Sequence, residues 1–531
     1  MPHDPLTDET VWGVPGAIIA PPVPGAKACS ATPLLDLLRV GASHDPEAIA
    51  LVSHTASLRY KDMLRLAQTA ARAIADRVPP GHTVACLLPR SPESVAALLG
   101  CLLSGRICMV LDPSHPAERQ AMLLADAAPS ALLLAEPPPF PCAAPAIMLR
   151  DVLAGPDRAW RADSDWNPNA PLAVYFTSGS SGRPKGIVLS ARSVLYRARS
   201  NAGYLEIGPG DRVFGPAAPI TAAGLSMLLG TLTHGARAVL ASTAQEGAGA
   251  VLRLIEREQV THAIIQPSLI RLWLPLERAG SAFRSLRRLR IGSSALPRQE
   301  LADWRTSLPS GCVIWHAYGS TEALIVANYI VPPDDAGGEA TVAAGILEAN
   351  HDYALLDDDD RPVAFGEPGE LVLRSRYVAL GEWRDGHLVP GRLPPVPGRP
   401  GWRFYRTGDL MRVRPDGMLH MLGRADRQVK IHGVRIEPAE IEAVLRAEPG
   451  VTDAAVVADR ASSGVTLHGF VAAAGADHGM LIPSLRQRLV TALPMTLRPA
   501  RLTVLDRLPL LPGGKTDLVA LARLAGSGVT T

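Results

Sequence analysis

The segment Leu172-Ala-Val-Tyr-Phe-Thr-Ser-Gly-Ser-Ser-Gly-Arg-Pro-Lys-Gly186 places an apolar strand directly before a loop of small hydroxyl residues and glycines, and Lys185 ends that loop. Glycines let backbone N–H groups turn toward an anion, hydroxyl groups donate further hydrogen bonds, and an ammonium supplies a positive charge. The segment therefore predicts a phosphate-binding loop, with a flexible polar surface loop as the alternative.

The spacing within this loop separates it from two common motifs. The Gly-x-x-x-x-Gly-Lys-Ser/Thr pattern of a Walker A loop is absent, and Gly186-Ile-Val-Leu189 predicts a second short strand before Ser190 caps a helix. The Gly-x-Ser-x-Gly pattern of a nucleophile elbow is absent from the loop as well. The segment is therefore expected to run strand, loop, strand and then helix.

Length and charge bound the class of protein. The chain has 531 residues, which at about 150 residues per domain predicts about three to four domains. Its 53 basic and 51 acidic side chains leave a formal charge of +2, so we expect neither nucleic acid nor an anionic membrane as a partner. A hydrophobic content of 47% is normal for a packed globular chain.

The cysteines and the absence of long apolar runs indicate the cellular compartment. The six cysteines include no Cys-x-x-Cys pair, which argues against a zinc knuckle and a disulfide ladder and favours reduced thiols. The N-terminus lacks the basic and apolar regions of a signal peptide, and no segment holds 18 uninterrupted apolar residues. We therefore expect a soluble, cytoplasmic protein.

Apolar spacing alternates between the helical and the strand type along most of the chain. Met63, Ala67, Ala70 and Ile74 recur at helical spacing. Helices interleaved with buried strands predict an α/β architecture with parallel pairing. Other segments of this pattern are a helix over 93–103 and strands over 84–88, 131–135, 173–176, 238–240 and 263–265.

The pattern changes near Gly423, after which about a hundred residues suffice for a separate α+β domain. There a helix can begin at Pro438, and the other expected elements are strands over 428–431, 454–457 and 465–471 and a helix over 485–493. Prolines over 21–25 predict an irregular start. The expected division is an irregular lead-in over 1–30, a large α/β domain over 31–425 and a small, mobile α+β domain over 426–531.

The loop at 175–186 resembles the signature of AMP-forming adenylating enzymes, the superfamily of acyl-CoA synthetases, adenylation domains of nonribosomal peptide synthetases and firefly luciferase. Other segments resemble further motifs of that family, in the family's order, from residue 32 onward. They are Leu111-Asp-Pro-Ser-His-Pro-Ala-Glu-Arg119, His316-Ala-Tyr-Gly-Ser-Thr-Glu322, Tyr405-Arg-Thr-Gly-Asp-Leu410, Gly423-Arg-Ala-Asp-Arg-Gln-Val-Lys-Ile-His-Gly433 and Leu511-Pro-Gly-Gly-Lys515.

The resemblance implies an enzyme, an acid–thiol ligase in which a carboxylate attacks the α-phosphorus of ATP, expels pyrophosphate and forms an acyl-AMP. Catalysis would then consist of positioning and charge stabilisation, with ATP and Mg²⁺ as cofactors. Glu322 would bind the metal, and Thr177, Thr321, Glu322 and Lys515 would be catalytic. The nucleotide would contact Thr177, Ser178, Gly179, Ser180, Ser181, Gly182, Lys185, Tyr318, Gly319, Ser320, Thr321, Asp409, Arg424 and Lys515.

The family's C-terminal motifs imply a second half-reaction. Asp426 matches the hinge position, where rotation of the small domain would withdraw Lys515, and Gly433 would line the tunnel for a pantetheine thiol. The thiol would convert the acyl-AMP into a thioester. A separate phosphopantetheinyl carrier protein is the first expectation and free CoA the alternative, which places the chain with stand-alone peptide-synthetase domains of secondary metabolism.

The acid is expected to be hydrophobic and to lack an α-ammonium. In family members that activate α-amino acids an aspartate usually pairs with the ammonium, but no Asp or Glu occurs between Arg212 and Gln245. Carried over from the family, the pocket residues would be Thr221, Ala222, Ala223, Ser226, Ile264, Leu289, Ile291, Ala317, Ile325 and Val326. A shift of one residue in the alignment would change this set of pocket residues. A nonstandard or β-amino acid is the alternative substrate.

Two alternative functions lie outside the class of adenylating enzymes. A serine hydrolase would use Ser180 or Ser181 and would require a histidine and an acid nearby. A regulatory protein would bind the nucleotide without the chemistry. Pyrophosphate exchange into ATP that depends on a carboxylic acid separates both from an adenylating enzyme.

Overall fold

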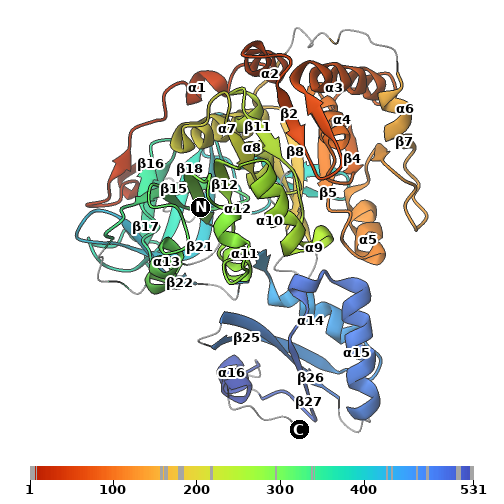
Figure 1. Cartoon of the computed structure of the whole chain (residues 1–531). Helices are drawn as coiled ribbons and strands as arrows, with labels where there is room; N and C mark the ends of the chain where they lie inside the picture. The colour runs from red at the N-terminus through yellow and green to blue at the C-terminus, as the bar shows by residue number, and fades with distance from the viewer. Residues whose placement is uncertain are drawn as a thin grey trace.

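The computed structural model shows a large N-terminal part and a small C-terminal part, drawn in blue below the large part in Figure 1. The structure describes all residues except 1–5, 7–8, 156–159, 161–165, 178–183, 216–218, 293–295, 336–338, 340, 426–427, 432–433, 462–463, 474–477, 510–515 and 527–531. Predicted residues Ser178, Gly179, Ser180, Ser181, Gly182, Asp426, Gly433 and Lys515 lie outside the described residues.

Two large mixed sheets and one antiparallel sheet form the frame of the large part. The ten-stranded sheet runs β1 (Ile19–Ala20), β16 (Ile346–Glu348), β15 (Leu324–Val331), β14 (Val313–Ser320), β13 (Arg288–Gly292), β12 (His262–Ile264), β10 (Arg212–Phe214), β11 (Arg237–Val239), β2 (Ile49–Val52) and β3 (Ser57–Arg59). The eight-stranded sheet runs β20 (His387–Val389), β19 (Gly381–Arg384), β9 (Lys185–Ser190), β8 (Pro171–Thr177), β5 (Ile107–Leu111), β4 (Thr83–Leu87), β6 (Ala131–Leu134) and β7 (Ala146–Met148). The antiparallel sheet runs β17 (Asp352–Leu356), β18 (Gly369–Ser375), β21 (Arg403–Val413) and β22 (Leu419–Arg424).

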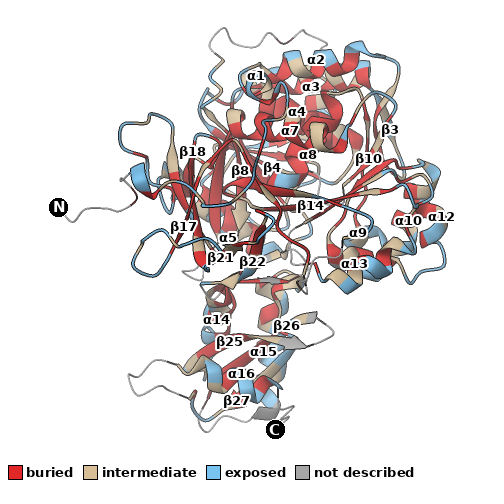
Figure 2. Cartoon of the chain, turned by 90° about the vertical axis from the view of Figure 1, so that its left-hand side faces the viewer, coloured by how far each residue is buried: buried red, intermediate tan, exposed pale blue. Residues whose placement is uncertain are grey.

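Helices pack between and around these sheets. The largest apolar core contains side chains of both large sheets and of α3, α4, α7 and α8, and Figure 2 shows the buried residues at the centre of the large part. The helices of the large part are α1 (Ala26–Cys29), α2 (Leu34–Ser43), α3 (Tyr60–Ala75), α4 (Pro92–Leu103), α5 (Ala117–Ala127), α6 (Leu149–Leu153), α7 (Ala191–Leu205), α8 (Ala222–Leu232), α9 (Thr243–Glu246), α10 (Ala248–Arg257), α11 (Pro267–Trp273), α12 (Ala279–Ala282) and α13 (Arg298–Arg305). No described helix has both the length and the apolar composition that crossing a bilayer requires.

The small C-terminal part has an apolar core of its own. Helices α14 and α15 cover a three-stranded sheet, and this α+β arrangement agrees with the expectation. The elements are β23 (Val429–Ile431), β24 (Val434–Ile436), α14 (Pro438–Arg446), β25 (Asp453–Ala461), β26 (Gly464–Ala472), α15 (His478–Ala492), β27 (Arg501–Leu505) and α16 (Leu518–Gly526).

Local sequence signals place many elements correctly. Met63, Ala67, Ala70 and Ile74 are fully buried on α3, as their helical spacing predicts. The hydroxyl of Ser190 accepts a hydrogen bond of 3.1 Å from the N–H of Ser193 and caps α7, directly after strand β9. The strand and helix order predicted around the signature loop is therefore confirmed.

The expected parallel pairing is found in part. The central pairs β4–β5 and β5–β8 are parallel, but β8 and β9 form an antiparallel hairpin, and so do β14 and β15. A short connection permits only antiparallel neighbours, so these two hairpins follow from their loop lengths. The lead-in is also more ordered than expected, because β1 pairs with β16 and Glu9 forms an ion pair with Arg374.

A buried ion pair connects the two parts of the chain. Arg119 on α5 donates a hydrogen bond of 2.5 Å to Oε1 of Glu440 on α14, and both side chains are buried. Burial raises the pKa of Glu440, and the Arg119 charge opposes that rise. Removal of one member of such a pair leaves the other charge buried without compensation, at a cost of about 3–5 kcal/mol.

We predict that Glu440→Gln weakens the docking of the small part on the large part. Trypsin should then cut the chain between the two parts faster than in the unsubstituted protein, because undocking exposes the connection. The matched control is Glu448→Gln, since Glu448 pairs with Arg488 inside the small part. Equal cleavage rates in Glu440→Gln and Glu448→Gln would show that the Arg119 pair does not hold the parts together.

Candidate active site

The hairpin of β8 and β9 brings the two ends of the signature loop together. Thr177 and Lys185 are paired residues at its base, and the intervening residues 178–183 lie outside the described part of the chain. The Thr177 hydroxyl is buried, and no described group makes a hydrogen bond with it. A buried hydroxyl without a partner costs free energy, so it is available to a ligand at this position.

Lys185 lies between two carboxylates that come from different segments. Its Nζ is 3.2 Å from Oε1 of Glu322 and 4.0 Å from Oε1 of Glu382, and all three side chains are buried. Glu382 on β19 also pairs with Arg384. No sequence motif marked Glu382, which reaches the site because β19 pairs with β9.

The hairpin of β14 and β15 carries the predicted nucleotide motif. Gly319 is necessary there, because a Cβ at this position would overlap the Leu324 carbonyl across the hairpin. Leu324 itself has a φ of 59°, a left-handed conformation that is rare for an apolar residue. The turn holds Thr321 and Glu322, and the Glu322 carbonyl accepts a hydrogen bond of 2.7 Å from the N–H of Ala379. The Ser320 hydroxyl accepts a hydrogen bond of 3.2 Å from the N–H of Ala323.

Asp409 on β21 receives two side-chain hydrogen bonds. The Tyr318 hydroxyl donates to Oδ2 and the Arg424 guanidinium donates to Oδ1, while the Asp409 N–H donates to the Thr407 hydroxyl at 3.0 Å. Burial and the Asp409 carboxylate raise the pKa of Tyr318 well above its ordinary value, so the phenol remains a donor. Each carboxylate oxygen keeps a second lone pair for a ligand hydroxyl.

The predicted pocket residues do not all share one face of the ten-stranded sheet. Ile264, Ala317 and Ile325 pack in one apolar cluster, whereas Leu289 and Ile291 belong to a different cluster around Trp273. Ser226 is buried, and its hydroxyl accepts a hydrogen bond from Asn201 at 3.3 Å. The remaining pocket candidates are Thr221 at the N-cap of α8, the exposed Ala223, and Ala222 and Val326 in the central core.

The strand register explains this separation. Arg290 lies opposite Ile264 and Trp315, and Gly292 lies opposite Ala317, so Arg290 and Gly292 occupy the face on which the structure places Ala317. Adjacent residues of a strand point to opposite faces. The structure therefore places Leu289 and Ile291 on the face opposite to that of Ile264 and Ala317, and Arg290 and Gly292 share the face of Ile264 and Ala317.

Models of two families match the chain: that of the AMP-binding enzyme over residues 38–383 and that of the AMP-binding enzyme C-terminal domain over residues 440–515. The chain belongs to the AMP-binding enzyme family. It is an AMP-forming ligase with the adenylate-forming fold. Enzymes of this family use ATP, normally with Mg²⁺, and form acyl-AMP from an acid.

Curated relatives include peptide synthetases. The chain is 34% identical over 455 residues to the probable non-canonical nonribosomal peptide synthetase CymA of Salinispora arenicola, covering 83% of this chain and 6% of that protein. It is 32% identical over 495 residues to novobiocin biosynthesis protein H of Streptomyces niveus, covering 90% of this chain and 80% of that protein.

Solved structures share the fold. The artificially fused adenylation–PCP di-domain NpsA-ThdA from Klebsiella oxytoca superposes with a TM-score of 0.79 at 20% identity, covering 89% of this chain and 86% of that one. The structure of IdnL1 superposes with a TM-score of 0.74 at 27% identity, covering 90% of this chain and 98% of that one.

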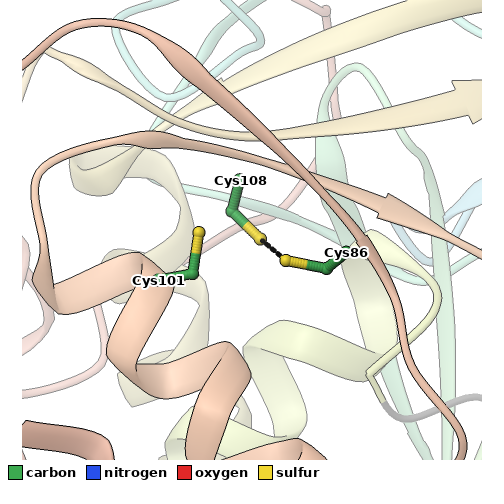
Figure 3. Close-up of side chains that lie close together, drawn as sticks. All are labelled: Cys86, Cys101 and Cys108. Carbon is green, nitrogen blue, oxygen red and sulfur yellow. Dashed lines mark hydrogen bonds between the residues drawn. The ribbon is translucent and has the colours of Figure 1, made fainter. Parts of the chain in front are cut away.

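Three cysteines meet outside this site. Figure 3 shows Cys86 on β4, Cys101 on α4 and Cys108 on β5, with the Sγ atoms of Cys86 and Cys108 3.6 Å apart. All three are buried in the central apolar core, and the two neighbouring thiols together with burial raise the pKa of Cys108 well above its ordinary value. Their sequence spacing did not reveal this proximity, which arises because α4 connects two neighbouring strands.

We predict that Tyr318→Phe lowers the free energy of unfolding by about 1–3 kcal/mol, because Asp409 loses one of its buried donors. Urea denaturation followed by tryptophan fluorescence measures this loss. Tyr329→Phe serves as the control, since the Tyr329 hydroxyl donates to Asp335 at a less buried position and its removal should cost less. A smaller loss in Tyr318→Phe than in Tyr329→Phe would contradict the role given to this contact.

Proposed function

We propose that this chain activates a carboxylic acid as its acyl-AMP and then transfers the acyl group to the pantetheine thiol of a carrier protein. The observation that supports it most is that two contacts from different sheets reach the β14–β15 hairpin: Lys185 with Glu322, and Asp409 with Tyr318. A phosphate-binding cation, an acidic metal ligand and a ribose acceptor are the groups that a nucleotide requires.

The first half-reaction joins two anions, so charge stabilisation is its main requirement. A carboxylate oxygen of the acid bonds to the α-phosphorus of ATP, the bond from that phosphorus to the bridging oxygen breaks, and pyrophosphate leaves with the electron pair. Lys185 and the Thr177 hydroxyl bind the phosphates, together with Ser178, Gly179, Ser180, Ser181 and Gly182. Thr321 contacts the α-phosphate, and no protein nucleophile takes part.

The residues present fit a magnesium ion. Glu322 offers a buried carboxylate beside the base of the loop, and Mg²⁺ is bound by one or two carboxylates together with substrate phosphates. The ion, when bound, neutralises and orients the triphosphate. Glu322 would exchange its contact with Lys185 for the metal, and this exchange frees the lysine ammonium for a phosphate.

The adenosine side of the site consists of the Asp409 network. Asp409 accepts from the ribose hydroxyls through its free lone pairs, and Arg424 and Tyr318 hold the carboxylate in place. The backbone of Gly319 and Ser320 lies in the same hairpin, along which the adenine stacks. Because Tyr318 already donates to Asp409, the orientation of its ring is set before the nucleotide binds.

The second half-reaction uses the small C-terminal part. Lys515 contacts the carboxylate and the α-phosphate during adenylation, rotation about Asp426 withdraws it, and Gly433 then lines the path of the thiol. The thiolate sulfur bonds to the acyl carbon and AMP leaves. The peptide-synthetase relatives and the adenylation–PCP neighbour favour a carrier protein over CoA, and they favour a role in secondary metabolism.

The acid lacks an α-ammonium in this proposal. An α-amino acid would need a carboxylate partner, and the segment from Arg212 to Gln245 supplies none. In this proposal the pocket would be less apolar than the sequence suggested, because Arg290, not Leu289 or Ile291, shares the face of Ile264 and Ala317.

Pyrophosphate exchange into ATP tests the proposal. We expect exchange that depends on a carboxylic acid and Mg²⁺, measured with a panel of short, medium, aryl and amino acids. A serine hydrolase or a regulatory nucleotide-binding protein would return no label to ATP. Thioester formation on a phosphopantetheinylated carrier domain, compared with free CoA, then identifies the acceptor.

We predict that Lys515→Ala lowers the exchange rate by about 10²–10³, because the transition state loses a positive charge. Lys61→Ala is the control, since Lys61 is an exposed residue that pairs with Glu47. Both variants should unfold at the same temperature as the unsubstituted chain. Full exchange activity in Lys515→Ala would contradict the role given to this lysine.

A further inference from the structure

A buried arginine lies on the face of the ten-stranded sheet that carries Ile264 and Ala317. Arg290 lies on β13 in register with Ile264 on β12 and Trp315 on β14, and its side chain is 7% exposed. Its guanidinium lies over the Trp315 ring, 5.0 Å from the centroid, and its Nη1 is 3.5 Å from the side-chain Oδ1 of Asn201.

Among the residues that the structure describes, the positive charges around Arg290 outnumber the negative ones. Glu348 accepts two hydrogen bonds from Arg197, of 2.8 and 2.9 Å, and a third of 2.8 Å from Asn328. Burial lowers the pKa of the neighbouring His351 to about 3, so that imidazole is neutral. Two guanidinium groups therefore share one carboxylate, and that carboxylate is bonded to Arg197.

Arg290 has no carboxylate within 4.0 Å in the described part of the chain, and its buried Nε has no hydrogen-bond partner there. The undescribed stretches 216–218 and 293–295 contain no Asp or Glu. Burial and the Arg197 charge lower the pKa of Arg290 to about 9, so the group is still a cation at neutral pH. An unpaired buried charge of this kind costs several kcal/mol.

We propose that Arg290 binds a second carboxylate on the acid substrate, at the end opposite the carboxylate that is adenylated. This inference rests on the proposed function and names the substrate class of the same site, a dicarboxylic acid. A substrate carboxylate supplies the missing anion, and the planar guanidinium can bind it through two parallel hydrogen bonds.

The position of Arg290 fits this role. It lies two residues before Gly292, which pairs with Ala317, and two residues of a strand span about 6.6 Å. Ala317 directly precedes Tyr318, so Arg290 lies one strand step away from the nucleotide hairpin. The Asn201 amide connects it to Ser226, a residue assigned to the pocket from the sequence alone.

The test compares each acid with its monomethyl ester, which keeps the length and removes one charge. The probes are succinate, glutarate, adipate and isophthalate with their monomethyl esters, assayed by acid-dependent pyrophosphate exchange. We expect at least one diacid to exceed its ester by about 100-fold in kcat/KM. In Arg290→Met that preference should disappear through a rise in KM that is much larger for the diacid than for its ester.

A second measurement separates substrate binding from a structural role. If Arg290 is held without an anion in the free protein, Arg290→Met should unfold at the same temperature or a higher one, because an apolar chain replaces an uncompensated charge. Arg288→Met is the control on the same strand, since Arg288 pairs with Glu206. A melting temperature for Arg290→Met well below that of Arg288→Met would overturn the inference.

The outcomes distinguish this inference from the proposed function. Exchange with monoesters that equals or exceeds that with every diacid, or an equal loss for both in Arg290→Met, would refute the role of Arg290 and leave adenylation intact. No exchange with any carboxylic acid would refute the proposed function itself.

Discussion

The ion pair between Lys185 and Glu322 is the contact on which the site depends, because it joins the eight-stranded sheet to the ten-stranded sheet. Both groups are buried, and a buried charge without a partner destabilises the fold. Asp409 on the antiparallel sheet contacts the same β14–β15 hairpin through Tyr318. The pairing of these buried groups therefore brings three sheets to the β14–β15 hairpin. There the phosphates, the metal and the ribose of ATP would each find a group of the opposite character.

The requirement that buried charges be paired also applies to the part of the site that would bind the acid. Glu348 compensates Arg197, while the positive charge of Arg290 is not compensated by a described carboxylate. Such a residue lowers the stability of the free protein and raises its discrimination between ligands, because only an anionic ligand removes the penalty. At the nucleotide end of the proposed site, the charged side chains of the protein neutralise one another. At the other end, the second carboxylate of the substrate would neutralise Arg290.

Local signals in the sequence predicted much of the fold, including helix α3, the cap at Ser190 and the strands around the signature loop. They did not predict Glu382, which reaches Lys185 only because β19 pairs with β9 over a long separation in sequence. Nor did they decide whether Leu289 or Arg290 lies on the face of the sheet that carries Ala317. A shift of one residue moves every side chain of a strand to the other face, and only the register with β12 and β14 decides which face is correct.

The most direct test of the central claim is a crystal structure with a nonhydrolysable ATP analogue and Mg²⁺ bound. We predict that the ribose hydroxyls lie within hydrogen-bond distance of the Asp409 carboxylate, that the metal binds Glu322, and that Lys185 turns toward the β and γ phosphates. A nucleotide bound elsewhere, or a ribose that makes no contact with Asp409, would contradict it.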